Sequence, residues 1–206
     1  MAAGRFSPRQ KDGDALINGV FRLEEVSMSD VKPLSLAELE AGLGLIRQSP
    51  AQDGALVMIV RRPAVDAREV LREGQLDELE GLAGDNWKSK GSAPNREAQL
   101  TLMNQRVIAL LAGTEARWPE AGDQLFVDLD LSADNLPAGT LLAIGSAVIE
   151  ISALPHTGCD KFKARFGLDA LKFVNSPEGK QMRLRGLNAK VIVPGAIRVG
   201  DRVMKL

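Results

Sequence analysis

Apolar positions along this chain fall mostly into short runs with the spacing of strands. The clearest run is 55–60, a continuous apolar segment that predicts a buried strand and that Arg61, Arg62 and Pro63 stop. Gly145 and Ser146 separate two later runs, which predicts a compact hairpin. Further strands are predicted at 20–27, 68–72, 124–129, 140–144, 147–153, 188–193 and 195–203.

One segment has the periodicity of a longer helix, from about residue 96 to residue 112. Asn95 is placed to cap its start, and Gly113 is placed to end it. Its apolar stripe consists of Leu100, Met103, Val107, Leu110 and Leu111.

Three shorter helices are also predicted. The first covers 35–45 with Ser35 as N-cap, the second begins with Asp160 as its cap, and the third begins at Ser176 and Pro177. The predicted strands therefore cluster and do not alternate regularly with helices. This favours an α+β, β-rich, barrel-like fold with a few packed helices. We expect residues 55–206 to form this domain, with 1–54 as an N-terminal extension packed on it or leading into it.

Composition limits the classes of protein that fit. Apolar residues make up 45% of the 206 positions, which is enough for a substantial core. The single cysteine excludes an intramolecular disulfide framework and cysteine-rich zinc or iron–sulfur sites within one chain. Residues 1–14 lack the apolar region of a secretory signal, and no run approaches the ~20 apolar residues of a membrane span. We expect a cytoplasmic protein with neither a membrane nor a nucleic acid as partner.

Charge is distributed unevenly although the net charge is only −1. Residues 159–206 carry a net charge of +7, and residues 1–158 carry −8. This basic segment begins at the only cysteine, which suggests an anionic ligand or partner near the thiol. A solvated lysine-rich surface is the alternative interpretation.

Cys159 and His156 are the only cysteine and the only histidine, and they are three residues apart. Cys159 follows Gly158 in a predicted loop, at the start of a predicted helix, and Lys161 and Arg165 follow closely. That setting favours a reactive thiolate, whereas an isolated cysteine is otherwise often a small buried apolar residue. His156 could support the thiolate as an imidazolium or contact a ligand, or it could simply shape the turn.

Two more arginines could take part in binding. Arg183 and Arg185 alternate, so in an extended segment both guanidiniums would lie on one side and could bind a phosphate together. They could equally be ordinary surface residues. The glycine-containing segment 81–85 lacks the Gly-Lys-Ser/Thr ending of a phosphate-binding loop, so it is interpreted as a turn.

The cysteine segment resembles the signature of the MOSC domain, a family named for the C-terminal part of molybdenum cofactor sulfurase. The resemblance spans about 55–203. The residues that carry it are Pro155-His156-Thr157-Gly158-Cys159, Lys161, Phe162, Arg165 and Phe166-Gly167, with flanking matches at 81–87, 136–140, 144–145, 185–191, 195 and 199–201.

This resemblance implies a stand-alone MOSC domain in which Cys159 either binds the molybdenum of a pterin cofactor or carries sulfur as a persulfide. Lys161, Arg165, Arg183 and Arg185 would bind the anionic cofactor, and His156 would assist Cys159. The implied activity is reduction of small N-hydroxylated compounds with a partner protein as electron donor. The alternatives are a sulfur or cofactor carrier supplied by a pyridoxal-phosphate-dependent desulfurase, and a folded thiol protein that binds no cofactor.

Overall fold

Seven strands close into a barrel in the computed structural model, which describes residues 32–89 and 94–206. They are β1 (Asp53–Arg61), β5 (Leu100–Asn104), β6 (Leu125–Asp128), β7 (Leu141–Ile144), β8 (Ala147–Ile151), β9 (Leu187–Val193) and β11 (Arg202–Lys205). The order around the barrel is β11-β7-β8-β9-β5-β6-β1, and β1 pairs back with β11. The pairing of β5 with β6 is parallel, and the other barrel pairings within the described residues are antiparallel.

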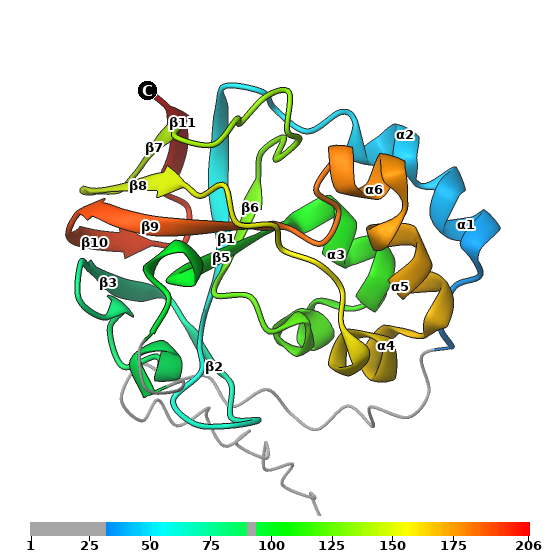
Figure 1. The fold of residues 1–206 in the computed structure, drawn as a ribbon, viewed down its shortest axis with the longest axis horizontal. Coiled ribbons are helices and arrows are strands. Elements are labelled where there is room, and N and C mark those ends of the chain that lie inside the picture. The colour runs from blue at the N-terminus through cyan, green and yellow to red at the C-terminus, as the bar shows by residue number, and fades with distance from the viewer. Residues whose placement is uncertain (1–31, 90–93) are drawn as a thin grey trace, which may run out of the picture.

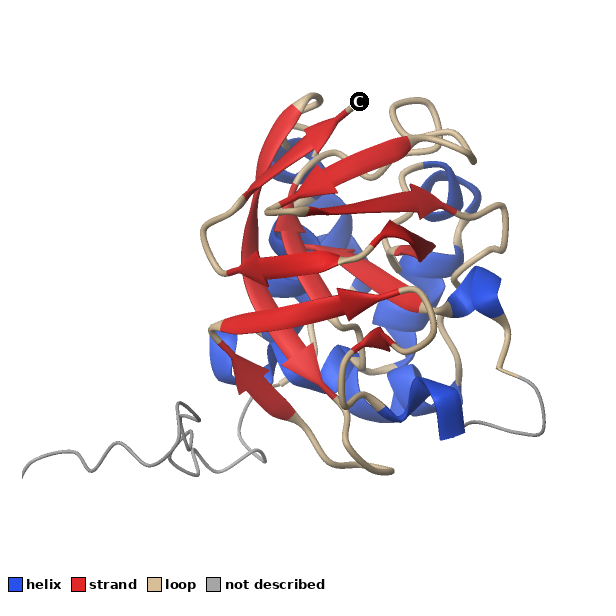
Figure 2. Cartoon of the chain, turned by 90° about the vertical axis from the view of Figure 1, so that its left-hand side faces the viewer, coloured by secondary structure: helices blue, strands red, loops and turns tan. Residues whose placement is uncertain are grey.

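A smaller sheet and one extra strand complete the β structure of the described residues. Strand β2 (Glu69–Leu71) pairs with the end of β1, and β10 (Gly195–Arg198), β3 (Glu73–Asp77) and β4 (Gly81–Leu82) form a separate three-stranded sheet. Figure 2 shows the strands in front of most of the helical segments. The predicted β-rich barrel with a few helices is therefore confirmed.

The helices gather on one side of the barrel (Figure 1). They are α1 (Leu36–Ala41), α2 (Leu43–Ile46), α3 (Gln105–Ala112), α4 (Asp160–Phe166), α5 (Leu168–Asn175) and α6 (Pro177–Gln181). The described residues also contain the 3-10 turns η1 (Asn86–Ser89), η2 (Arg96–Ala98) and η3 (Glu115–Ala121), of which η2 packs against β9. In the described part of the chain, none of the helices combines the length and apolar character needed to cross a membrane.

Two hydrophobic cores hold this arrangement together. Strand β1 contributes to both: Leu56 and Ile59 belong to the core inside the barrel, whereas Met58 and Val60 pack under the helices. The α5 residue Phe173 lies in the second core, so the helices that flank the cysteine segment are anchored on the outside of the barrel.

The predicted helix over 96–112 is wrong in its first half. Residues 100–104 form β5, which pairs with β6 and β9. Before β5 the chain has only the short 3-10 turn η2, which Asn95 caps, and α-helix forms only in the second half, as α3. Leu100 and Leu102 are fully buried inside the barrel, so burial between two strands overrides their helical spacing. Asn104 marks the true start of α3, because its side-chain Oδ1 accepts hydrogen bonds from the N–H groups of Arg106 and Val107.

Most of the other predicted elements are confirmed within small shifts. The helix over 35–45 divides at Gly42 into α1 and α2, and Ser35 caps it with Glu38 in a reciprocal pair of bonds. The hairpin at 145–146 joins β7 to β8. The strand predicted at 20–27 lies outside the described residues, and the division into 1–54 and 55–206 stays a prediction.

Candidate functional site

Cys159 is exposed and occupies the N-cap position of α4, in place of the predicted cap, Asp160. The segment before it leaves β8 and passes over α5. Gly158 fits closely there, because a Cβ atom at this position would lie 2.8 Å from Leu171 Cδ1. Asn175, the last residue of α5, binds Gly158 on both sides: Oδ1 accepts from the Gly158 N–H (2.9 Å), and Nδ2 donates to the Gly158 carbonyl (3.1 Å). The backbone next to the thiol is thus fixed by one side chain.

We expect Asn175→Ala to loosen this segment. The variant loses two hydrogen bonds worth about 1 kcal/mol each, so exchange of the Gly158 amide hydrogen should accelerate markedly. Asn135→Ala is the matched control, because Asn135 also donates to two carbonyls, those of Ala51 and Asp130, away from the thiol. Equal protection of the Gly158 amide in wild type and Asn175→Ala would show that the side chain does not hold the segment.

Cys159 opens into a cavity of about 290 Å³ whose walls are strongly basic. Its charged lining consists of five cations, Arg62, Arg68, Lys161, Arg165 and Arg185, and one carboxylate, Asp66. His156 and Phe162 also line it. The structure therefore brings the predicted residues Cys159, His156, Lys161, Arg165 and Arg185 together around one space.

Arg62 is held by a buried ion pair. The Asp85 carboxylate, fully buried, accepts from Arg62 Nε (2.9 Å) and Nη2 (2.8 Å), and Arg62 Nη1 donates to the Gly122 carbonyl (2.8 Å). Asp85 also accepts from the backbone N–H groups of Arg62 and Trp87. The segment 81–85, which contains β4 and the turn after it, thus supplies the carboxylate that positions a cation in the wall of the cavity.

Arg185 is positioned in a similar way by Asp123. Arg185 Nη1 donates to Asp123 Oδ2 at 2.7 Å, Nη2 donates to the Ala121 carbonyl at 2.9 Å, and the guanidinium lies 5.0 Å from the centre of the Phe162 ring. Both side chains of the pair are buried. Such a pair fixes the direction of the guanidinium and leaves Arg185 Nε without a described partner.

The surroundings of His156 favour a neutral ring, whereas an imidazolium was one of the interpretations that the sequence left open. Burial and the nearby positive charge of Arg185 outweigh the opposite effect of Asp123 and lower the pKa of His156 to about 4. Its Nδ1 lies 3.6 Å from Asp123 Oδ1, and each atom is buried without a described hydrogen-bond partner. Because an ionised carboxylate can only accept, the arrangement favours a proton on Nδ1 and leaves Nε2 as an acceptor.

The cations of the cavity crowd one another. Burial, Arg165 and Arg62, in that order, lower the pKa of Arg68, and Asp66 and Asp85 only partly oppose them. Arg165 donates to the Glu120 carbonyl (2.6 Å) and lies 3.5 Å from Asp66. An anion in the cavity would relieve this repulsion, so the electrostatics favour an anionic ligand.

Arg183 does not join this group. Residues 182–185 form a turn rather than an extended segment, and Arg183 has a φ of 48°. Its Nη1 donates to the Leu136 carbonyl at 2.6 Å, and its side chain lines a different cavity from that of Arg185. The prediction that Arg183 and Arg185 share one side of a strand is wrong, because the positive φ redirects the chain between them.

The donor set suits a large anionic group better than a bare metal ion. Among the described residues, no three His, Cys, Asp or Glu side chains come together as a metal site. Cys159 offers one soft sulfur ligand beside several cations, which repel a free divalent ion but attract an anionic group that brings its own metal ligands. A molybdenum bound to a phosphate-bearing pterin has that character, so the residues fit it.

Sequence reasoning missed the residues that hold the site in place. Asp123, Arg62, Arg68 and Asn175 carry no local motif, and Asp123 is 62 residues from Arg185 in the chain. One of their partners did carry a sequence signal: Asp85, which binds Arg62, lies within the glycine-containing segment 81–87 that resembles a family element.

Comparisons with known proteins agree with this fold. The YuaD protein of Bacillus subtilis has a TM-score of 0.54 at 15% identity, covering 73% of this chain and 94% of that one. YiiM of Escherichia coli gives 0.50 at 20% identity (74% and 69% covered), and YiiM of Geobacillus stearothermophilus gives 0.52 at 14% identity (74% and 75% covered). No curated protein sequence matches the chain.

A family profile decides the classification. The profile described as "MOSC domain" matches residues 96–204, more than half of the chain, and includes Cys159, His156 and Arg185. The chain belongs to the MOSC domain family, which is associated with the molybdenum cofactor.

Proposed function

We propose that this protein binds a molybdenum pterin cofactor in the Cys159 cavity and reduces small N-hydroxylated compounds with electrons from a partner protein. The observation that supports this most directly is the convergence of one exposed thiol and five cationic side chains on a single cavity. Membership of the MOSC domain family points to the same cofactor.

Each residue has a role in this proposal. Cys159 Sγ is the soft ligand for molybdenum, and Lys161, Arg165 and Arg185 bind the anionic part of the cofactor. Arg62 and Arg68, which the sequence did not single out, belong to the same wall and add to the positive field. Asp85 and Asp123 orient two of these guanidiniums without reaching the cavity wall themselves.

The reaction is a two-electron reduction that breaks the N–O bond of the substrate. Two electrons and two protons convert an N-hydroxylated compound to the N–H compound and water. The bound cofactor supplies the redox chemistry, and the partner protein supplies the electrons. The chain itself binds and orients the cofactor and the substrate, and the neutral His156 ring offers Nε2 as an acceptor in the cavity wall.

A persulfide carrier is the second candidate, and the exposure of Cys159 favours it. A sulfur donor such as a pyridoxal-phosphate-dependent desulfurase must bring its persulfide to the acceptor thiolate, so the acceptor has to be accessible. Cys159 is exposed at the start of α4. In that case the outer sulfur is transferred to Cys159, and the donor leaves as its thiolate.

Metal and sulfur content distinguish the two functions. Protein purified from a host that makes the pterin cofactor should contain molybdenum and release a fluorescent oxidised pterin. Cys159→Ser should lose the metal, because a hydroxyl is a poor substitute for a soft thiolate ligand. Arg198→Ala removes one exposed charge away from the cavity and should keep the metal.

The outcomes separate the candidates. Equal absence of molybdenum in wild type and Cys159→Ser, even after incubation with intact cofactor, contradicts the oxidoreductase. The mass of one added sulfur atom on Cys159 would then support the carrier. Absence of both metal and persulfide would leave a folded thiol protein without a cofactor.

A further inference from the structure

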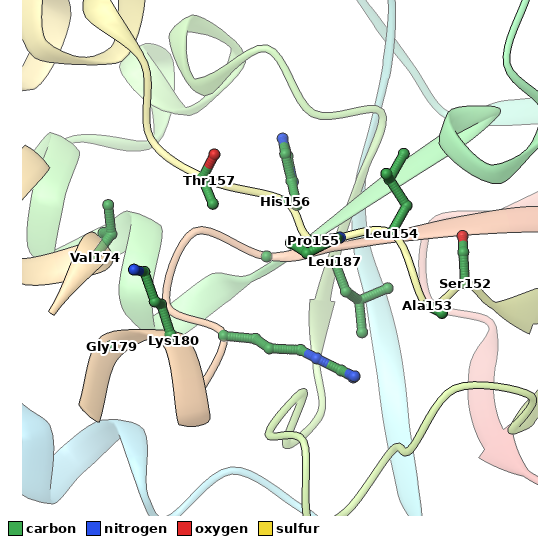
Figure 3. A pocket seen from close by; sticks show the side chains of 12 residues that line it. Ser152, Ala153, Leu154, Pro155, His156, Thr157, Val174, Gly179, Lys180 and Leu187 are labelled. Atoms are coloured by element: carbon green, nitrogen blue, oxygen red, sulfur yellow. The ribbon is translucent and has the colours of Figure 1, made fainter. Parts of the chain in front are cut away.

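A second cavity, of about 450 Å³, lies beside the segment that leads to Cys159. Figure 3 shows its walls: the segment that follows β8 on one side and α6 on the other. Its volume is within the range of small-molecule sites. Its lining residues and those of the Cys159 cavity have only His156 in common.

The charged groups of this second cavity are all positive. Lys180 and Arg183 line it, and no Asp or Glu is among its lining residues. Within the described residues, the Arg183 guanidinium bonds through Nη1 to the Leu136 carbonyl and, at 3.5 Å, to the Leu131 carbonyl, and no carboxylate pairs with it. Burial lowers the pKa of Arg183, as expected for a half-buried cation without an opposite charge nearby.

The remaining walls are largely apolar. Leu154, which is unusually exposed for a leucine, faces this space together with Pro155, Val174 and Leu187. The labelled side chains in Figure 3 show Val174 and Lys180 on one side of the cavity and Leu154 and Leu187 on the other. A ligand that fits must therefore combine an apolar body with a negatively charged group.

The backbone at Arg183 is held in an uncommon conformation. Its φ of 48° lies in the left-handed region, which is unfavourable for a residue with a long side chain. Glycine would adopt this conformation freely, yet the chain has an arginine whose side chain lines the cavity. The position thus combines local strain with a cation that no carboxylate of the described residues neutralises.

We propose that this second cavity binds a small organic anion. Its carboxylate or phosphate group lies near Lys180 and Arg183, and its apolar body packs against Leu154, Val174 and Leu187. This site is separate from the Cys159 cavity, so it does not depend on the proposed molybdenum chemistry.

The test uses benzoate and phenyl phosphate as probes on the cofactor-free full chain. Titration followed by amide nitrogen–proton NMR should give saturable shifts at residues 153–157 and 179–187. Arg183→Gln should weaken binding roughly tenfold or more, because a charge-assisted hydrogen bond is lost. Lys180→Gln should also weaken binding. Because Lys180 is exposed, this variant should fold, so it still tests the proposal if Arg183→Gln does not fold.

Matched controls isolate the cause. Arg198→Gln changes the net charge equally at an exposed site paired with Glu73, and it should leave the affinity unchanged. Cys159→Ser should also leave it unchanged, which keeps this result independent of the molybdenum experiment. Benzyl alcohol and inorganic phosphate should each bind more weakly than phenyl phosphate, since each lacks one half of the ligand. Comparison of benzoate with phenyl phosphate identifies the preferred anionic group.

Three results would overturn the proposal. The first is shifts confined to the Cys159 cavity, at Arg62, Gly122 and Lys161. The second is equal affinity in wild type and in both the Arg183 and Lys180 variants. The third is the absence of saturable binding for both probes at millimolar concentration.

Discussion

Asp123→Ala is expected to lower the free energy of unfolding by about 3–5 kcal/mol, a large fraction of the stability of a typical domain. The Asp123 side chain is completely buried and accepts a hydrogen bond from the guanidinium of Arg185, whose side chain is 8% exposed. Asp123 is the carboxylate that neutralises this buried cation. Removal of the carboxylate leaves a buried guanidinium whose remaining described contacts are the Ala121 carbonyl and the Phe162 ring. Urea denaturation followed by circular dichroism measures the change.

Two comparisons show whether the uncompensated charge is the cause. Asp123→Ala combined with Arg185→Met should be less destabilising than Asp123→Ala alone, because the second change removes the unpaired cation. Asp53→Ala breaks the exposed pair with Arg202 and should lower the free energy of unfolding far less than Asp123→Ala does. A loss of about 1 kcal/mol or less in Asp123→Ala would show that water or a shift of Arg185 compensates for the missing carboxylate.

The sequence predicts the site best where its residues are neighbours in the chain. Cys159, His156, Lys161 and Arg165 lie within ten positions, so a single loop and the short helix α4 bring them together. Phe162 and Phe166 are one helical turn apart and both are buried, which fixes the orientation of α4. Local periodicity and capping therefore account for this part of the cavity.

The residues that hold the cavity together come from distant parts of the chain. Asp123 precedes β6 and Arg185 precedes β9, and they meet because both strands pair with β5. Arg62 follows β1, whose sequence shows only an apolar run. No local rule pairs an aspartate with an arginine 62 positions away. Their pairing depends on strand order, which the pattern of apolar residues does not determine.

The two local errors have different physical causes. At 100–104, helical spacing and strand pairing compete for the same apolar residues, and burial between β6 and β9 decides the outcome. At 182–185, the alternation of Arg183 with Arg185 has the period of a strand, but the positive φ of Arg183 turns the chain. In both cases tertiary structure overrides a short sequence pattern.

The environment of His156 also predicts how stability depends on pH. Its pKa is about 4 in the folded protein, below the ordinary value of 6.5, because the 17%-exposed ring is poorly hydrated and close to Arg185. As the pH falls below about 6.5, the unfolded chain binds a proton at this residue before the folded chain does. Protonation therefore favours unfolding, and this effect grows until the pH reaches about 4 and is constant below it.

Between pH 7 and pH 4, His156 should lower the free energy of unfolding of the wild type by about 3 kcal/mol, which corresponds to the difference between its two pKa values. We expect His156→Gln to lack this decrease. The other ionisable groups are common to wild type and variant, so the difference between their unfolding free energies isolates His156. NMR gives an independent check, because the chain has one histidine and its imidazole signal needs no assignment. A folded-state midpoint at or above 6.5 would contradict the prediction. It would mean that the Asp123 carboxylate, 3.6 Å from Nδ1, stabilises an imidazolium more strongly than burial and Arg185 oppose it.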